Sequence, residues 1–265
     1  MKAARQLRER IKQETPTLGA IVSFHLWIGI VEIARSTGLD YLIVDTEHHR
    51  FDHELIADVC ALGRMVDYPI LIRPPSIDPT TIRLAMDAGP CGLLLPMVDD
   101  VSILETVKEG AFMPPRGKRR PGGPGNRWVG NYDYATWKAE VEDELIILPQ
   151  IESPTGLDNA EAIASHPLTT ALAVGPYDLS AHLGVCWQPE APSLLHALER
   201  IRVAARAVGK TMWMIGDGPA LRKRGFSFVC IAEPIMLLES SLKDLVQRTR
   251  SSQTAGLGGA AMPLP

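Results

Sequence analysis

Residues able to do chemistry stand at the ends of four long apolar runs. The runs cover residues 41–48, 69–74, 145–153 and 171–180, and they end in or near Asp45 and His48, Arg73, Glu152 and Asp178. Buried parallel strands read as nearly continuous apolar runs, and barrels built from such strands gather their active site at the strands' C-terminal ends. We therefore predict that these five side chains belong to one site.

Glu152 and Asp178 are candidate metal ligands. Glu152 closes one predicted strand, and Asp178 follows the next strand after a short turn at Gly175 and Pro176. Neighbouring strands lie about 4.8 Å apart, which lets the two carboxylates converge. Mg²⁺ is commonly held by one or two carboxylates, while water and substrate oxygens fill its remaining positions. The alternative is structural, because acids at such junctions often cap the following helix or form salt bridges.

His48 is a candidate general base. It follows Asp45 by three residues, and an aspartate at this spacing can orient an imidazole that exchanges a proton near neutral pH. A structural alternative is a partly buried histidine whose hydrogen bond is satisfied. Because His49 and His53 follow closely, a zinc site made by the three histidines is also open, although their spacing matches no recognised zinc motif.

Arg73 is a candidate anion-binding residue. It ends an apolar run, so its guanidinium is expected to point into the mouth of a barrel. There it would bind a carboxylate or stabilise a developing enolate oxygen. The structural alternative is an ion pair with a nearby acid such as Glu47.

The elements that must position these residues alternate between strand-like and helix-like segments. Strands are predicted at residues 18–24, 41–47, 68–74, 92–98, 145–152, 170–175, 211–216 and 226–232. Eight strands, each followed by helical periodicity, predict an α/β fold of the TIM (β/α)8 barrel type. A doubly wound open sheet is the alternative, but the first predicted strand lacks the G-x-G-x-x-G turn usual in that fold.

Two segments depart from the regular alternation. Residues 1–250 are expected to form one barrel domain, and residues 251–265 are Gly-rich and aperiodic, which predicts a flexible C-terminal tail. Residues 113–130 combine prolines, glycines and five basic residues. A loop of this length is either a lid or a plain connection, and both interpretations stay open.

Charge and cysteine content narrow the class of function. The formal net charge is -4, which gives no basic field for nucleic acid or anionic lipid, so we expect a small-molecule partner. No apolar run approaches the roughly 18 residues of a spanning helix, and the N-terminal segment lacks a signal peptide's apolar centre, so a cytoplasmic location is expected. The cysteines are interpreted as small core residues, since their wide spacing fits no disulfide or zinc framework: Cys60, Cys91, Cys186 and Cys230.

Several familiar catalytic motifs are absent from the sequence. No lysine stands at the C-terminal end of a predicted strand, where a Schiff-base aldolase needs one. The sequence also lacks G-x-S-x-G, the P-loop and H-E-x-x-H, which removes the main support for serine hydrolase, phosphate-loop and zincin functions. Gly216-Asp217-Gly218 after the seventh strand is the single hint of a phosphate-binding barrel.

Several motifs follow one another in order along the chain: VDTEH at 44–48, LIRPP at 71–75, LLLPMVDD at 93–100, PPRGKR at 114–119, QIES at 150–153 and GPYDLSAHLG at 175–184. Together they resemble the HpcH/HpaI aldolases, the metal-dependent class II pyruvate aldolases. The resemblance implies a TIM barrel, usually hexameric, whose last helix is exchanged between subunits. It also implies a divalent metal ion, Mg²⁺, Mn²⁺ or Co²⁺, and cleavage of 4-hydroxy-2-oxo acids to pyruvate and an aldehyde.

The resemblance also implies roles for individual residues. Glu152 and Asp178 correspond to the metal ligands, and Arg73 to the residue that stabilises the pyruvate enolate. His48 with Asp45 corresponds to the acid/base dyad. The remaining positions are Glu47, which would support the site from outside the ligand sphere, and the substrate-binding residues Gly175, Pro176 and Tyr177.

The chain departs from the family's pattern at positions that we expect to crowd the mouth of the barrel. Tyr177 is bulky where the family carries a small or polar residue, and His49-Arg50 follow VDTEH where a small residue is usual. Arg120 replaces a usual glycine, and its positive charge would favour an anionic or differently shaped acceptor. The metal and enolate residues are present, whereas the aldehyde and the productive direction stay open.

Two other functions remain open for the same residues. A decarboxylase of 2-oxo diacids such as oxaloacetate, coupled to carbon–carbon bond formation, would use the same enolate chemistry. A non-catalytic barrel would instead keep these charged residues for structural reasons.

Overall fold

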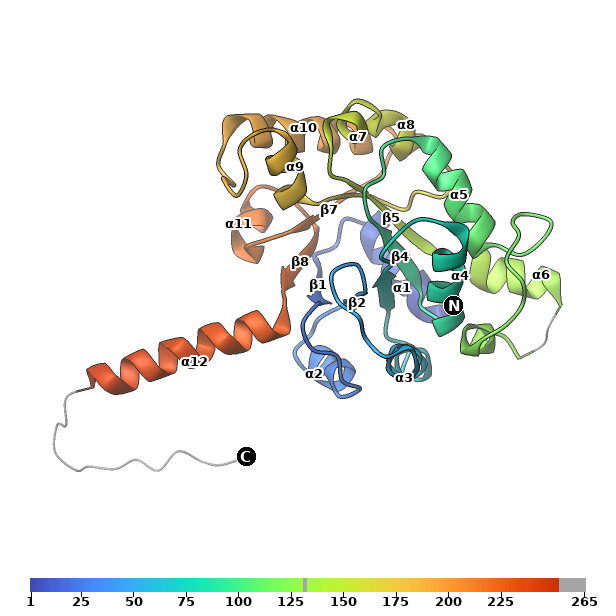
Figure 1. The fold of residues 1–265 in the computed structure, drawn as a ribbon, viewed down its shortest axis with the longest axis horizontal. Helices are drawn as coiled ribbons and strands as arrows, with labels where there is room; N and C mark the ends of the chain where they lie inside the picture. Colours follow the sequence, from blue (N-terminus) through green and yellow to red (C-terminus); the bar gives the residue numbers. More distant parts are fainter. Residues whose placement is uncertain (131–132, 253–265) are drawn as a thin grey trace.

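The computed structural model, which describes residues 1–130 and 133–252, contains one closed barrel of parallel strands (Figure 1). The strands follow one another in sequence order, and the last pairs with the first. They are β1 (Thr17–Val22), β2 (Tyr41–Asp45), β3 (Ile70–Arg73), β4 (Gly92–Leu95), β5 (Ile146–Ile151), β6 (Leu172–Val174), β7 (Met212–Ile215) and β8 (Phe228–Ala232). The predicted TIM barrel is confirmed, and all eight strands lie inside or within one residue of their predicted ranges.

The helices lie outside the barrel, and all but the last pack around it. They are α1 (Lys2–Lys12), α2 (Ile30–Ser36), α3 (His53–Met65), α4 (Pro79–Ala88), α5 (Val101–Ala111), α6 (Tyr134–Trp137), α7 (Pro154–Asp158), α8 (Ala160–Ser165), α9 (Pro176–His182), α10 (Pro192–Ala207), α11 (Gly218–Lys223) and α12 (Pro234–Ser251). Helices α3, α4 and α5 begin at aspartates whose side chains accept backbone N–H groups of the first helical turn: Asp52, Asp78 and Asp100. These caps end the strand-to-helix loops at fixed points.

The barrel interior is filled with side chains, so the site can form only at its ends. Tyr41 and Trp213 are fully buried, and the Trp213 indole N–H donates to the Tyr41 hydroxyl at 2.8 Å. The Tyr41 ring occupies the space that a Cβ on Gly19 would need, which explains a glycine in the middle of β1. At the end where the strands begin, α1 buries Ala4, Leu7 and other apolar residues.

The segment at residues 113–130 lies at the end of the barrel where the strands begin. Its Arg119 side chain is buried and pairs with Asp87 of α4 at 2.8 Å, and Gly125 packs against the backbone of Met86. A 3₁₀ helix at Pro124–Trp128 also packs on α3 and α4. The segment is therefore a connection that does not cover the mouth of its own chain. The expectation that Arg120 crowds the mouth is wrong for the same reason.

Helix α12 projects away from the barrel (Figure 1). Over its described length none of its side chains is buried, and six of them are large and apolar: Met236, Leu237, Leu238, Leu242, Leu245 and Val246. The boundary expected at residue 250 falls within this helix, and residues 253–265 of the expected tail lie outside the described residues. Within residues 1–130 and 133–252, no helix combines the length and the apolar content needed to cross a membrane.

Candidate active site

A cavity of about 610 Å³ opens where the barrel strands end. Apart from Glu47, every site residue predicted from the sequence lines it: Asp45, His48, Arg73, Glu152, Gly175, Pro176, Tyr177 and Asp178. Of the departures from the family's pattern, His49 and Tyr177 line this mouth cavity, whereas Arg50 lines a different one. The alternation of strand and helix has thus gathered residues from distant parts of the chain.

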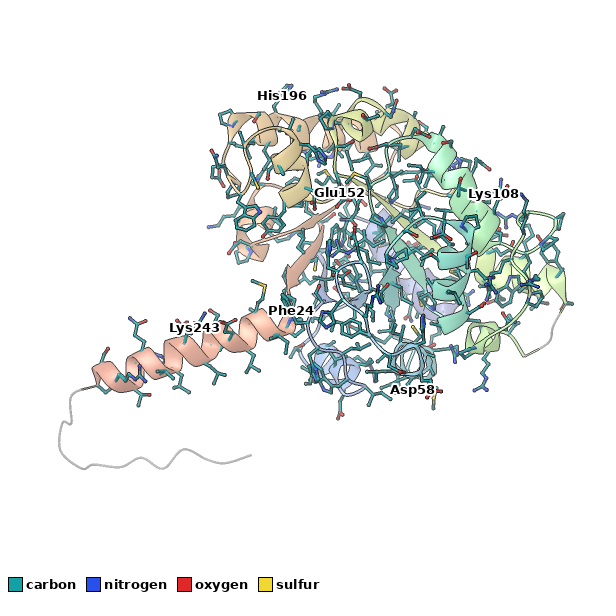
Figure 2. All side chains as sticks on the ribbon, in the orientation of Figure 1. Phe24, Asp58, Lys108, Glu152, His196 and Lys243 are labelled. Atoms are coloured by element: carbon teal, nitrogen blue, oxygen red, sulfur yellow. The ribbon has the colours of Figure 1, made fainter. Side chains whose placement is uncertain are left out.

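Glu152 is a buried acid of the mouth cavity. It follows β5 directly, is 3% exposed and lies inside the molecule rather than among the outer helices (Figure 2). Its Oε2 accepts the backbone N–H of Met97 at 2.7 Å, and its Oε1 accepts the side-chain N–H of Gln150 at 3.2 Å. Burial, together with the nearby charges of Glu47 and Asp178, raises the pKa of Glu152 to about 7.

Asp178 stands in the first turn of α9 and is exposed to the cavity. The helix-cap alternative fails for both acids. Ser153 caps the helix after Glu152 by accepting the N–H of Gly156, and Gly175 occupies the cap position before Asp178. Their carboxylates are therefore not used by helix ends.

Gly175 and His182 fix the relative placement of the two acids. A Cβ on Gly175 would overlap Oε1 of Glu152, so the close approach of β6 to this carboxylate requires glycine. His182 Nδ1 lies 2.9 Å from the Glu152 carbonyl oxygen and 3.0 Å from that of Asp178. Because both neighbours are acceptors, Nδ1 carries the proton and ties the end of β5 to α9.

Arg73 is held by two acids, one at the end of β2 and one just after it. Its Nε and Nη2 donate to the two carboxylate oxygens of Asp45 at 2.9 and 2.7 Å, and its Nη1 lies 3.1 Å from Oε2 of Glu47. Asp45 and Arg73 stand opposite each other in the pairing of β2 with β3. Burial alone would raise the pKa of Asp45, but the hydrogen bonds and charge of Arg73 lower it below its usual value. The ion pair with Glu47, weighed as the structural alternative, is thus present together with a stronger one.

His48 does not form the expected dyad with Asp45. The oxygens of Asp45 accept from Arg73, from the Ser23 hydroxyl and from the backbone N–H of Glu47. The His48 side chain is 65% exposed at the rim, where its Nε2 lies 3.7 Å from Oε2 of Glu47. The pairing fails because Asp45 ends the strand facing the barrel interior, whereas the chain has turned outward by His48.

The donor set suits an oxygen-preferring cation. Among the described residues, no three His, Cys, Asp or Glu side chains come close enough to hold a metal alone, so the zinc site of three histidines is not formed. Glu152 and Asp178 offer carboxylate oxygens. Within the described part of the chain, Gln150 Oε1 is a further buried oxygen at the site without a hydrogen bond, and Glu47 Oε2 has only its ion pairs and no hydrogen bond. Two carboxylates with open positions fit a hard divalent ion that takes its other ligands from water and substrate.

Three supporting residues were not singled out from the sequence. Gln150 precedes Glu152 by two positions and so shares its side of β5, and His182 follows Asp178 by four positions on one helical face. Both spacings could have been recognised in the sequence. Met97 has a backbone φ of 47°, which aims its N–H at Glu152, and no sequence pattern announces this conformation.

The interpretation of all four cysteines as core residues is wrong for one of them. Cys60, Cys91 and Cys230 are buried, and burial raises the pKa of Cys91 and Cys230 to about 12. Cys186 is exposed in the loop between α9 and α10. The three buried cysteines therefore supply no nucleophilic thiolate to the mouth.

Comparisons with known proteins identify the family that the chain resembles. Residues 28–231 match the family model described as HpcH/HpaI aldolase/citrate lyase. The hydroxypyruvate/pyruvate aldolase of Chromohalobacter salexigens is 32% identical over 226 residues, which cover 82% of this chain and 87% of that protein. The 2-keto-3-deoxy-L-rhamnonate aldolase of Klebsiella pneumoniae is 32% identical over 227 residues, which cover 82% of this chain and 85% of that protein.

A solved structure extends the likeness to the fold. The HpcH/HpaI aldolase of Desulfitobacterium hafniense superposes with a TM-score of 0.85 at 24% identity, covering 95% of this chain and 99% of that one. At this identity the likeness shows the shared barrel. The chain belongs to the HpcH/HpaI aldolase/citrate lyase family of enzymes.

Proposed function

We propose that this protein is a divalent-metal-dependent carbon–carbon lyase that cleaves 4-hydroxy-2-oxo acids to pyruvate and an aldehyde, or joins them in the reverse direction. The observation that carries the proposal is the buried carboxylate of Glu152 beside Asp178, in one cavity with Arg73. When bound between the two carboxylates, Mg²⁺, Mn²⁺ or Co²⁺ would supply a Lewis acid for the carboxylate and keto oxygens of the 2-oxo acid.

Arg73 is suited to stabilise the enolate oxygen. Asp45 grips one edge of its guanidinium with two hydrogen bonds, which fixes the plane of the group before substrate arrives. A donor that is fixed in advance stabilises charge as it develops without reorganising. Because Arg73 stays charged, it serves equally well for cleavage and for condensation.

His48 is suited to move the proton of the substrate hydroxyl. Its exposed position at the rim, beside the carboxylate of Glu47, lets it exchange protons with water. In cleavage it would take the proton from the 4-hydroxyl group, directly or through a water molecule. In condensation it would return that proton to the aldehyde oxygen.

Deuterium exchange tests the enolate step without any aldehyde. The protein is stripped with a chelator, Mg²⁺, Mn²⁺ or Co²⁺ is restored, and incorporation of deuterium from D₂O into the pyruvate methyl group is followed by NMR. We expect exchange that depends on the metal and that falls at least about 100-fold in Glu152→Gln and in Asp178→Asn, because each loses a ligand. Metal affinity measured by calorimetry should fall in the same variants.

The control replaces an acid far from the mouth. Glu161→Gln alters an exposed residue of α8 and should exchange at the unmodified rate. Metal-independent exchange, or none with any of the three metals, would overturn the proposal. Rapid loss of CO₂ from oxaloacetate in the absence of an aldehyde acceptor would instead favour the decarboxylase.

A further inference from the structure

A second cavity, of about 400 Å³, adjoins the mouth cavity between α9, α10 and α11. We call it the side cavity. Five residues line both cavities, among them Tyr177 and Asp217, so the two spaces are neighbours with a common wall. Most of the large side chains around the side cavity are apolar: Tyr177, Trp187, Leu194, Leu198, Met214 and Leu221.

Two aromatic side chains of the side cavity are left open to solvent. Tyr177 is 62% exposed and Trp187 is 79% exposed. Trp187 also has a backbone φ of 59°, a left-handed conformation that costs a bulky residue free energy. Because the fold of this chain leaves most of the Trp187 side chain uncovered, the ring is available for contact with a bound molecule.

A buried serine sets the positions of both aromatic residues. Ser180 of α9 is 1% exposed, and its hydroxyl donates to the Tyr177 carbonyl oxygen at 2.6 Å. The hydroxyl oxygen of Ser180 in turn accepts the backbone N–H of Trp187 at 3.2 Å. The short chain of hydrogen bonds ties the Trp187 loop to the helix that also carries Asp178, so the side cavity is built as one unit with the mouth.

The charges around the side cavity do not favour an anion. Asp217 caps α11 by accepting the N–H of Ala220, and Glu190 adds a second carboxylate. One guanidinium, that of Arg224, also lines the cavity and lies 5.6 Å from the centre of the Phe226 ring. Two carboxylates against one guanidinium give no net positive field, and Arg120, the cation that would have favoured an anionic acceptor, lies at the other end of the barrel.

We propose that the side cavity binds an apolar substituent of the acceptor, so that the aldehyde class is a neutral aldehyde with an alkyl or aryl tail. The inference rests on the proposed function, because the carbonyl carbon must react in the mouth cavity. The tail extends from the mouth cavity past Tyr177, which lines both cavities, and packs against Trp187 in the side cavity. A cavity of this volume suits a tail of several carbon atoms.

The aldehyde preference is tested with a series of unbranched acceptors. The metal-restored enzyme is given pyruvate with acetaldehyde, butanal or hexanal, and with 5-oxopentanoate as a negatively charged acceptor close to hexanal in length. We expect kcat/KM to rise about tenfold or more from acetaldehyde to hexanal, within the limit of about fourfold for each fully buried methylene. Hexanal should exceed 5-oxopentanoate by a similar factor.

Trp187→Gly tests the side cavity directly. Glycine accepts the left-handed backbone without strain, so the variant removes the ring and keeps the fold. The hexanal-to-acetaldehyde ratio of kcat/KM should fall about fourfold, the effect of burying one methylene. Trp187→Phe should keep most of the ratio, and Met65→Ala, an exposed apolar residue of α3 far from the mouth, should leave it unchanged.

Pyruvate exchange measured on the same samples separates the two proposals. Suppose that metal-dependent pyruvate exchange is intact. A kcat/KM that does not change with aldehyde length, a preference for 5-oxopentanoate, or an unchanged hexanal-to-acetaldehyde ratio in Trp187→Gly would then overturn the role of the side cavity, while the enolate function stands. Loss of metal-dependent exchange in the unmodified enzyme would overturn the proposed function and the side cavity's role with it.

Discussion

Asp45 and Arg73 form the ion pair on which the geometry of the mouth depends. Both are largely enclosed, and their side chains meet through two parallel hydrogen bonds. Breaking a buried pair costs more than forming it contributes, because the remaining charge loses its partner in a poorly solvated place. Asp45 therefore belongs to the positioning of Arg73, which is a different task from orienting His48.

The pair makes stability depend on pH in a defined direction. Asp45→Asn should lower the free energy of unfolding at neutral pH by about 3 kcal/mol, since Arg73 keeps its charge. Although burial alone would raise it, the pKa of Asp45 lies below its usual 3.8 because Arg73 stabilises the carboxylate. A carboxyl group whose pKa is lowered in the folded protein stabilises the fold at pH values above its usual pKa. This stabilisation is lost as the pH falls through the folded-state pKa.

Urea unfolding followed at neutral pH and at several values below pH 3.8 measures this dependence. The curves of the unmodified protein and of Asp45→Asn should approach each other as the pH falls. Asp158→Asn, which removes an exposed partner of Arg200, should change little at any pH. A difference for Asp45→Asn that stays constant down to the lowest pH would contradict the argument.

The sequence identified which residues reach the mouth but not how they pair. Apolar runs mark strands, and strand ends mark the mouth, so Glu152, Asp178 and Arg73 could be placed together without a structure. The partner of Asp45 depends on the register between β2 and β3, which puts Arg73 opposite it. Register is set by packing across the whole barrel, so local spacing wrongly favoured His48.

The turn between β6 and α9 is the element that brings the two acids together. Gly175 lets the backbone approach Glu152 so closely that a methyl group would displace the carboxylate. Gly175→Ala should therefore weaken metal binding and slow pyruvate exchange by about 10- to 100-fold, the usual effect of disturbing a ligand's support. Calorimetry with Mn²⁺ and the NMR exchange assay measure the two losses.

Gly122→Ala is the matched control for this element. Gly122 has open space where the added Cβ would lie, and its backbone is not left-handed, so the substitution should leave both measurements unchanged. Equal losses in the two variants would show a general effect of removing glycine. Unchanged binding in Gly175→Ala would show that Glu152 is free to move and that the tight approach of β6 is not needed.

The position of residues 113–130 followed from topology more than from composition. The segment comes after α5 and before β5, and connections from a helix to the next strand lie at the end where strands begin. Its length and basic content drew attention to a lid, yet Arg119 is committed to Asp87 inside the protein. In a barrel, successive loops alternate between the two ends, and this alternation predicts the position of a loop better than its length does.

At the scale of the whole molecule, α12 is the element least explained by a single chain. In the common barrel the last helix covers its own strands, whereas here it projects outward and leaves a row of large apolar side chains exposed. Leu238, Leu242 and Leu245 follow the spacing of one helical face. We propose that this face packs on a second copy of the chain, as the family resemblance implies for its exchanged last helix.

Light scattering coupled to size-exclusion chromatography tests the proposed assembly. With a chain mass of 29.0 kDa, a hexamer should elute with about six times that mass. Leu242→Glu places a charge on the apolar face and should shift the protein to smaller species, because the charge would be buried without a partner. Lys243→Glu changes a charge beside that face and should keep the assembly. A measured mass of 29.0 kDa for the unmodified protein would contradict helix exchange.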